Sequence, residues 1–217
     1  MDDARTSFPG SSGEHFLQDL YGTRDRAEGF YRRQVVDVLT PRMVEFLARQ
    51  TMMVVASVDP DGAPDVSVRF GEPGFVSALD DRTMVWPEMR GNGVFTTLGN
   101  LAKTPGAHVM FLDLEHRIGL HVRGEAEIVE AEDAGAYRAP ATPGRAPERW
   151  VVFRVRNSYI HCRKHFPRTD GLIDWGTDDS AAKGGDYFGA TGIASPWDAH
   201  EPEPAPPRRG LFFRRNR

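Results

Sequence analysis

Several features that would place a sequence in a particular class are missing from this chain of 217 residues. It has a single cysteine, Cys162, which excludes an intrachain disulfide framework and favours a reducing compartment. No apolar run approaches the roughly 20 residues of a membrane-spanning helix. The first residues lack a basic segment followed by an apolar one, so we expect no signal peptide. These absences predict a cytoplasmic protein with no membrane partner.

A strong charge of either sign is also missing. The net charge is −4 and the sequence pI is about 6.0, which disfavours a general nucleic-acid binder. His108 and His116 have no partner at a spacing typical of zinc ligands, so we predict no metal site. The sequence contains no internal repeat, and its length allows a substantial core.

The sequence is organised around residues 84–110, which change from strand to turn to helix to strand. Residues 83–86 are β-prone and are followed by Pro87. We predict a turn over residues 88–93, because two glycines around Asn92 reach positive φ at little cost. The first strand of this unit is therefore expected to end before the turn.

A helix is predicted directly after this turn. Val94, Leu98 and Leu101 recur at i, i+4 and i+7, which is one face of a helix. Asn92 is a candidate N-cap, and residues 104–106 (Thr-Pro-Gly) end the helix. An apolar strand is expected over residues 107–112.

Turn and helix together suggest an anion site. Small residues allow backbone N–H groups to approach a ligand, and the positive end of the helix dipole points to the same place. Arg90 adds a planar donor fork suited to phosphate. A phosphate monoester is the simplest ligand, but the spacing matches no known phosphate fingerprint, and an ordinary capped helix start explains the same residues.

The remaining pattern is mainly β. Two helices are expected before the first strand, over residues 23–38 and 40–50, and a short helix over residues 131–137. Hairpin connections and a single helix inserted among the strands predict a closed or nearly closed antiparallel barrel. Gly124 is expected to permit a bulge or a close backbone approach. The predicted strands cover residues 51–58, 65–70, 75–79, 83–86, 107–112, 117–129 and 150–162.

The organisation expected along the chain is a barrel between two extensions. Residues 1–13 are predicted to be disordered and residues 14–50 to hold the N-terminal helices. The barrel covers residues 51–165. A C-terminal extension follows over residues 166–200, and residues 201–217 are a flexible tail rich first in proline and then in basic residues.

The order of these motifs resembles one known family. A hairpin around DGAP, a turn and helix reading RGN…TLGNLAKTP and a strand reading LHVRGEAEI are similar to the pyridoxamine 5'-phosphate oxidase-like flavin-binding proteins. The resemblance covers roughly residues 43–165, and YIHCRK resembles the late segment with which one subunit reaches the cofactor of its partner. It implies a split antiparallel β-barrel with N-terminal helices and one inserted helix, a homodimer with FMN at the subunit interface, and flavin-dependent oxidoreductase activity on a small molecule.

The resemblance also implies which residues hold the cofactor. One subunit would contribute the second strand of the hairpin together with the strand end and turn before the inserted helix. The partner would contribute the long strand and the last strand. For Glu88 the competing interpretation is a solvated loop carboxylate, and for Trp86 a core residue. The implied cofactor-binding residues are Ser67, Val68, Arg69, Trp86, Pro87, Glu88, Arg90 and Asn92 from one subunit, and Arg117, His121, His161 and Lys164 from the other.

This sequence departs from the true pyridoxamine phosphate oxidases at several positions. They have a basic residue at the position of Ser67 and an Arg-Lys pair at the position of Thr96 and Thr97. They also end in an Arg-x-His segment that the tail of this chain lacks. We therefore expect an FMN-dependent oxidoreductase of unknown substrate rather than an enzyme of vitamin B6. The open alternatives are an F420-dependent reductase of the same fold, a non-catalytic flavin, F420 or haem carrier, and a purely structural barrel; the sequence assigns no catalytic residue.

Overall fold

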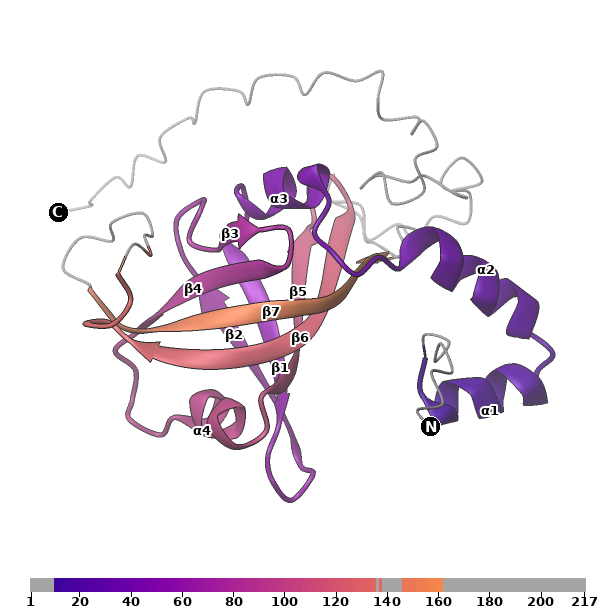
Figure 1. The fold of residues 1–217 in the computed structure, drawn as a ribbon, viewed down its shortest axis with the longest axis horizontal. Coiled ribbons are helices and arrows are strands. Elements are labelled where there is room, and N and C mark those ends of the chain that lie inside the picture. Colours follow the sequence, from indigo (N-terminus) through magenta and orange to yellow (C-terminus); the bar gives the residue numbers. More distant parts are fainter. Residues whose placement is uncertain (1–9, 136, 138–145, 162–217) are drawn as a thin grey trace, which may run out of the picture.

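The computed structural model describes residues 10–135, 137 and 146–161. Three helices precede a sheet of seven strands, and a fourth helix is inserted between the fourth and fifth strands (Figure 1). In chain order the elements are α1 (Ser12–Leu20), α2 (Arg24–Gln34), α3 (Pro41–Leu47), β1 (Met52–Val58), β2 (Pro64–Phe70), β3 (Ser77–Asp80), β4 (Thr83–Met89), α4 (Thr96–Lys103), β5 (Gly106–Asp113), β6 (Ile118–Glu130) and β7 (Pro147–His161).

All the strand pairs are antiparallel, and the strand order is β2-β1-β5-β6-β7-β4-β3. The predicted hairpin around residues 59–62 is confirmed. Asp59 Oδ1 accepts hydrogen bonds from the backbone N–H groups of Asp61 (2.9 Å) and Ala63 (2.8 Å), and Gly62 has φ 88°. The sheet curves into a split barrel, as expected, but no backbone pairing joins its edge strands β2 and β3 among the described residues.

The core fills the inside of the curved sheet. Alternate residues of each strand point inward, for example Met53 and Val55 of β1 and Leu120 and Val122 of β6, all fully buried. Helices α3 and α4 lie at opposite ends of the barrel (Figure 1). The buried helical residues that complete the core are Met43, Phe46 and Leu47 of α3 and Leu98 and Leu101 of α4.

The predicted bulge at Gly124 is confirmed. The pairing of β6 with β7 shifts by one residue between Arg123 and Gly124. A Cβ atom on Gly124 would lie 2.1 Å from the carbonyl oxygen of Arg154, so only glycine fits there. Because one extra residue in β7 reverses its alternation, Asn157 and Tyr159 point to the outer face of the sheet.

The strand before α4 is longer than predicted. β4 continues through Pro87 to Met89 and pairs with β7 over its whole length. Proline is tolerated here because β3 ends opposite Val85, so that the rest of β4 has only one neighbouring strand. Glu88 therefore lies in a strand and is not the solvated loop residue that the sequence suggested.

Two helix predictions are wrong. Asn92 is not an N-cap: its Oδ1 atom accepts a hydrogen bond from Val94 N, Gly93 turns the chain at φ 82°, and α4 begins only at Thr96. No helix forms over residues 131–137 where the chain is described; the segment makes isolated turns and contains Gly135 at φ 54°. So short a segment is a marginal helix without tertiary support.

Three helices, not two, precede the sheet. The predicted starts of α2 after Thr23 and of α3 at Pro41 are confirmed. The additional helix, α1, has Ser11 as its N-cap, whose side chain accepts a hydrogen bond from Glu14 N (3.1 Å). Ser-x-x-Glu is a capping signature that the sequence analysis missed.

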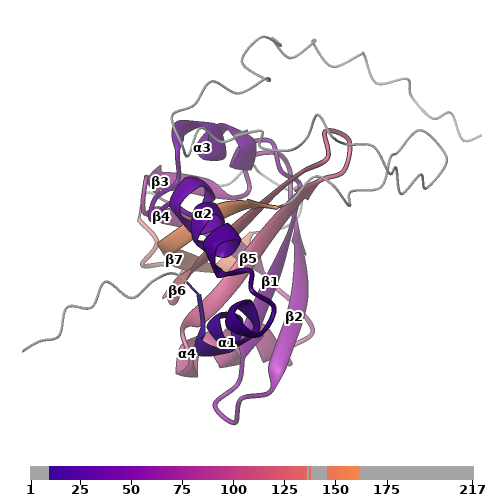
Figure 2. The ribbon, with the colours of Figure 1, turned by 90° about the vertical axis from the view of Figure 1, so that its right-hand side faces the viewer.

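The α1–α2 hairpin lies beside the barrel, in front of the outer face of the sheet (Figure 2). Phe30 of α2 contacts Tyr159 of β7 edge to face, with ring centroids 6.2 Å apart. Val36 after α2 forms a backbone bridge with Ser158. Within the described residues, no helix combines the length and apolar character needed to cross a bilayer. The expected segments 166–200 and 201–217 lie outside the described residues.

Candidate functional site

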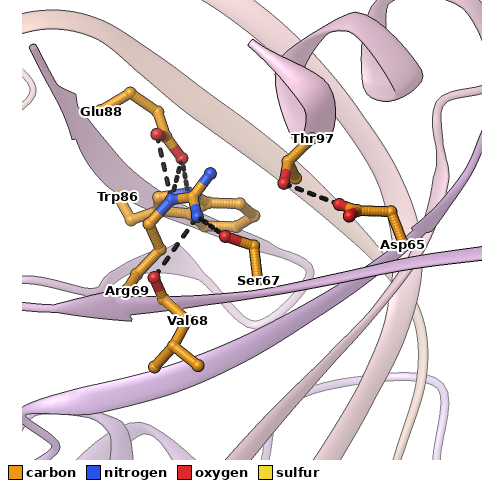
Figure 3. A network of polar contacts seen from close by, with 7 residues as sticks. All are labelled: Asp65, Ser67, Val68, Arg69, Trp86, Glu88 and Thr97. Atoms are coloured by element: carbon orange, nitrogen blue, oxygen red, sulfur yellow. Dashed lines mark hydrogen bonds and ion pairs between the residues drawn. The ribbon is translucent and has the colours of Figure 1, made fainter. Parts of the chain in front are cut away.

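The gap between the two halves of the barrel is spanned by side chains rather than by backbone pairing. Arg69 on β2 meets Glu88 on the free end of β4, with its Nε atom donating to both carboxylate oxygens at 2.8 and 3.0 Å. The two strands are far apart in strand order, so this ion pair holds the split of the barrel together (Figure 3). The side chains are 20% and 10% exposed.

Two neighbours fix the geometry of this pair. Ser67 Oγ accepts a hydrogen bond from Arg69 Nη1 at 2.6 Å, and Trp86 Nε1 donates to Glu88 Oε1 at 3.0 Å (Figure 3). The indole of Trp86 is fully buried, so it supports the carboxylate from the core side. The remaining nitrogen of Arg69, Nη2, makes no hydrogen bond with any described residue. The guanidinium is therefore oriented and neutralised, with one donor edge still available.

The N-terminal end of α4 lies beside this network. Its N-cap, Phe95, is in the left-handed region at φ 56° and has no side-chain acceptor to offer. Thr97 in the first turn donates its hydroxyl to Asp65 Oδ2 of β2 at 3.1 Å (Figure 3). The first-turn N–H groups therefore lack the side-chain cap that the sequence suggested, and one carboxylate already lies near them.

The other residues predicted on this side are less well placed. Val68 points to the outer face and is 42% exposed, and only its carbonyl oxygen makes a long contact (3.4 Å) with Arg69. Pro87 is buried on the face of β4 opposite Trp86 and Glu88. Arg90 and Asn92 are exposed beyond the end of β4, and Arg90 has no charged partner in the described chain. The structure thus brings together Ser67, Arg69, Trp86 and Glu88.

The residues predicted for the partner's site form a second group, on the outer face of β5, β6 and β7. His121 is linked through its Nδ1 to His108 Nε2 and through its Nε2 to His161 Nδ1, both at 2.8 Å. Tyr159 stacks on His121, with centroids 4.6 Å apart and planes at 10°. Sequence reasoning missed His108 because its partner follows from the register of the β5–β6 hairpin, not from sequence spacing.

The histidine chain is uncharged at neutral pH. Burial, with the nearby Arg123 guanidinium, lowers the pKa of His108 to about 4. Burial, followed by the charges of His108, His161 and Arg123, lowers the pKa of His121 to about 3. Neutral imidazoles have one donor and one acceptor each and can continue a hydrogen-bonded row. Among the described residues no group of three or more metal-ligating side chains is arranged to hold a metal ion.

Arg117 and Lys164 complete the predicted set. Arg117 lies in the turn before β6 with φ 57°, away from the histidine chain in sequence register. Lys164 lies outside the described residues.

Residues 39–162, more than half of the chain, match the sequence profile of the family described as pyridoxamine 5'-phosphate oxidase. This chain belongs to the pyridoxamine 5'-phosphate oxidase family. The matched region begins just before α3 and ends with β7, so it contains the whole split barrel and both groups of polar residues. The resemblance read from the sequence is thereby confirmed at the level of family and fold.

Three solved structures show how far the likeness to this family extends. HupZ of Group A Streptococcus is 21% identical, with 56% of this chain and 92% of that chain covered and a TM-score of 0.42. A putative pyridoxamine 5'-phosphate oxidase of Lactobacillus delbrueckii is 20% identical, with coverages of 57% and 95% and a TM-score of 0.43. An FMN-binding protein of Syntrophomonas wolfei is 15% identical, with coverages of 69% and 97% and a TM-score of 0.39. No curated protein matches this chain.

The residues present fit an FMN phosphate on the β2–β4 side. Arg69 offers an oriented donor edge, Arg90 offers an exposed guanidinium without a described partner, and α4 ends there with unsatisfied N–H groups. Glu88 is neutralised by Arg69, which limits its repulsion of a phosphate. Asp65 is the one carboxylate at this end that is not paired with a cation among the described residues.

Proposed function

We propose that this protein is an FMN-dependent oxidoreductase that acts on a small molecule as a cytoplasmic homodimer and is not an oxidase of vitamin B6. The observation that carries this proposal is the Arg69 guanidinium, which Glu88 and Ser67 hold in place with one donor edge available at the split of the barrel. A buried arginine with such an edge suits a phosphate group. The single cysteine in the chain supports a reducing compartment.

The two basic residues divide the binding of the phosphate. Arg69 gives direction, because its hydrogen bonds to Glu88 and Ser67 fix the plane of the guanidinium. Arg90 adds charge from the exposed loop, and the first turn of α4 adds backbone donors. When bound, FMN supplies the electron-transfer chemistry. The residues of the chain bind and orient it, and the buried Trp86 side excludes water.

The outer-face group supports a site shared between two subunits. His121 and His161 are neutral or hydrogen-bonded imidazoles on an open face of the sheet, and they do not contact Arg69 or Glu88 of their own chain in any described interaction. We propose that they meet the cofactor of the partner subunit as hydrogen-bonding groups, with Arg117 and Lys164 nearby in the same role. This arrangement requires the dimer for binding.

The first experiment is the absorption spectrum of the purified protein, with mass spectrometry of the compound that heat releases. Flavin bands and the mass of FMN support the proposal, and a deazaflavin mass would transfer it to F420. If the protein is colourless and neither cofactor binds or raises its melting temperature, the proposal fails. Reduction by NADH or NADPH faster than free FMN then separates an enzyme from a carrier.

A further inference from the structure

A cavity of about 470 Å³ lies between the α1–α2 hairpin and the outer face of β6 and β7, away from the Arg69 site. Figure 2 shows the hairpin in front of this face. The size is within the range of small-molecule sites. Arg123, Asn157 and Tyr159 form the sheet side of the cavity, and Glu14, Arg26, Phe30 and Tyr31 belong to the helical side.

The sheet side contains an unused hydrogen-bond acceptor. Asn157 Oδ1 is buried and has no hydrogen-bond partner in the part of the chain that the structure describes. A buried amide oxygen without a donor is costly, and most such atoms in folded proteins are paired. A ligand with an N–H group in this cavity would satisfy Asn157.

The cavity presents charges of both signs. Arg26 has no charged partner among the described residues, and the Arg123 guanidinium lies 5.3 Å from the centroid of the Tyr159 ring. Glu14 accepts a hydrogen bond from Tyr31 OH at 2.7 Å, and this bond is the main cause of the lowered pKa of Glu14. The carboxylate is therefore ionised at neutral pH. Two cations and one anion suit a ligand that is itself zwitterionic.

Aromatic rings shape the space between these charges. Phe30 and Tyr159 meet edge to face at an interplanar angle of 81°, and Tyr159 is held from its other side by His121. A planar ring fits against such surfaces better than a flexible chain does.

We propose that this cavity is a second binding site, which takes a zwitterionic aromatic compound of about amino-acid size with an N–H group on its ring. The carboxylate of the ligand faces Arg26 and Arg123, its ammonium faces Glu14, and its ring N–H donates to Asn157 Oδ1. The site is independent of the proposed FMN site, and its occupant ties the α1–α2 hairpin to the barrel.

The test uses L-tryptophan as the probe, with isothermal titration calorimetry and thermal melting of the full chain. We expect saturable binding and a higher melting temperature, because the ligand binds only the folded protein. Three related probes each lack one group: indole-3-propionate the ammonium, tryptamine the carboxylate and 1-methyl-L-tryptophan the ring N–H. Each is expected to bind about 10-fold more weakly than L-tryptophan.

Two variants locate the binding. Arg26→Gln removes an exposed cation and is expected to weaken L-tryptophan about 10-fold, whereas Arg32→Gln on the same helix, outside the cavity, leaves binding unchanged. Asn157→Leu is expected to make L-tryptophan and its 1-methyl derivative bind equally. Absence of saturable binding by all four probes, equal binding by Arg26→Gln and wild type, or displacement of L-tryptophan by excess FMN overturns the proposal of a separate site. The FMN proposal stands or falls on the separate spectrum of the purified protein.

Discussion

At the scale of single residues, the Arg69–Glu88 pair combines structural and binding roles. Both side chains are largely buried, and each depends on the other for its charge to be neutralised. Such a pair contributes little compared with an apolar substitute, but removing one partner is costly because a buried charge remains.

Replacing Arg69 should therefore reveal this coupling. Arg69→Met leaves Glu88 buried without its cation, and we expect the cofactor-free protein to lose about 2–3 kcal/mol of its free energy of unfolding. Adding Glu88→Gln should recover most of the loss, because an amide oxygen can still accept from Trp86. Urea denaturation of the four proteins of this cycle measures the coupling. Strictly additive effects would show that the pair does not hold the split of the barrel.

Arg90 offers the opposite case, a cation with no structural role. We expect Arg90→Ala to weaken FMN binding by about 1.5–3 kcal/mol, or roughly 10- to 150-fold, through loss of a charge-assisted contact. The melting temperature without FMN should not change, because Arg90 is exposed. Lys103→Ala at the other end of α4 is the matched control. An unchanged dissociation constant in Arg90→Ala removes this residue from the site.

The histidine chain predicts a dependence of stability on pH. The pKa values of His108 and His121 in the folded protein are about 4 and about 3, below the value near 6.5 of an unfolded chain. The unfolded state therefore binds more protons, so their contribution is complete above pH ~6.5 and is lost as pH falls from there towards the folded-state values. Denaturation midpoints at pH 7 and pH 5 should differ less in His121→Gln than in wild type. The same substitution at His116, whose side chain is 64% exposed, should leave the difference unchanged.

At the scale of elements, the bulge in β6 and β7 determines which side chains share a face. The shift at Gly124 places Asn157, Tyr159 and His161 of β7 on the same outer face as His121 and Arg123 of β6. Without the extra residue, these side chains of β7 would alternate into the core. The histidine chain and the cavity floor both depend on this bulge.

A side chain at the bulge should be poorly tolerated. In Gly124→Ala the new Cβ atom meets the Arg154 carbonyl at 2.1 Å and the buried Phe153 ring at 2.7 Å, so we expect a loss of about 2–3 kcal/mol in the free energy of unfolding. Gly99→Ala is the matched control: it lies within α4 with nothing within 4 Å of the added methyl, and should stabilise by about 0.5–1 kcal/mol. Thermal melting of both variants makes the comparison. Equal effects of the two substitutions would contradict the close approach at Gly124.

At the scale of the whole molecule, the two groups of polar residues belong to different sides of one barrel. The Arg69 group faces the split between β2 and β4, and the histidine chain lies on the outer face of β5, β6 and β7. One subunit does not bring them together in any described contact, which is the reason for proposing a shared site.

A mixed dimer tests this arrangement. Chains carrying Arg69→Met and chains carrying His121→Leu should each bind FMN weakly as homodimers. A heterodimer of the two, isolated through two affinity tags, has both changes in one site and neither in the other, so we expect it to regain half of the wild-type FMN stoichiometry. No recovery, with the heterodimer confirmed by light scattering, would place both residues in sites built from one chain.

The sequence by itself determined the family, the order of the strands, the β1–β2 turn and the special role of Gly124. These depend on local chemistry, such as the turn residues after Asp59 and the alternation of apolar residues in β6. It also pointed to Ser67 and Arg69 as neighbours, since residues two apart in a strand share a face.

Tertiary structure alone decided what those residues meet. Arg69 is 19 residues from Glu88 in sequence, and the two are paired only because the barrel closes across its split. His108 joins His121 through strand register, and α1 is visible in the structure although its apolar residues Phe16 and Leu20 are exposed and give no core signal. Local pattern specifies the elements, whereas long-range pairing, which depends on how the whole sheet curves, specifies the site.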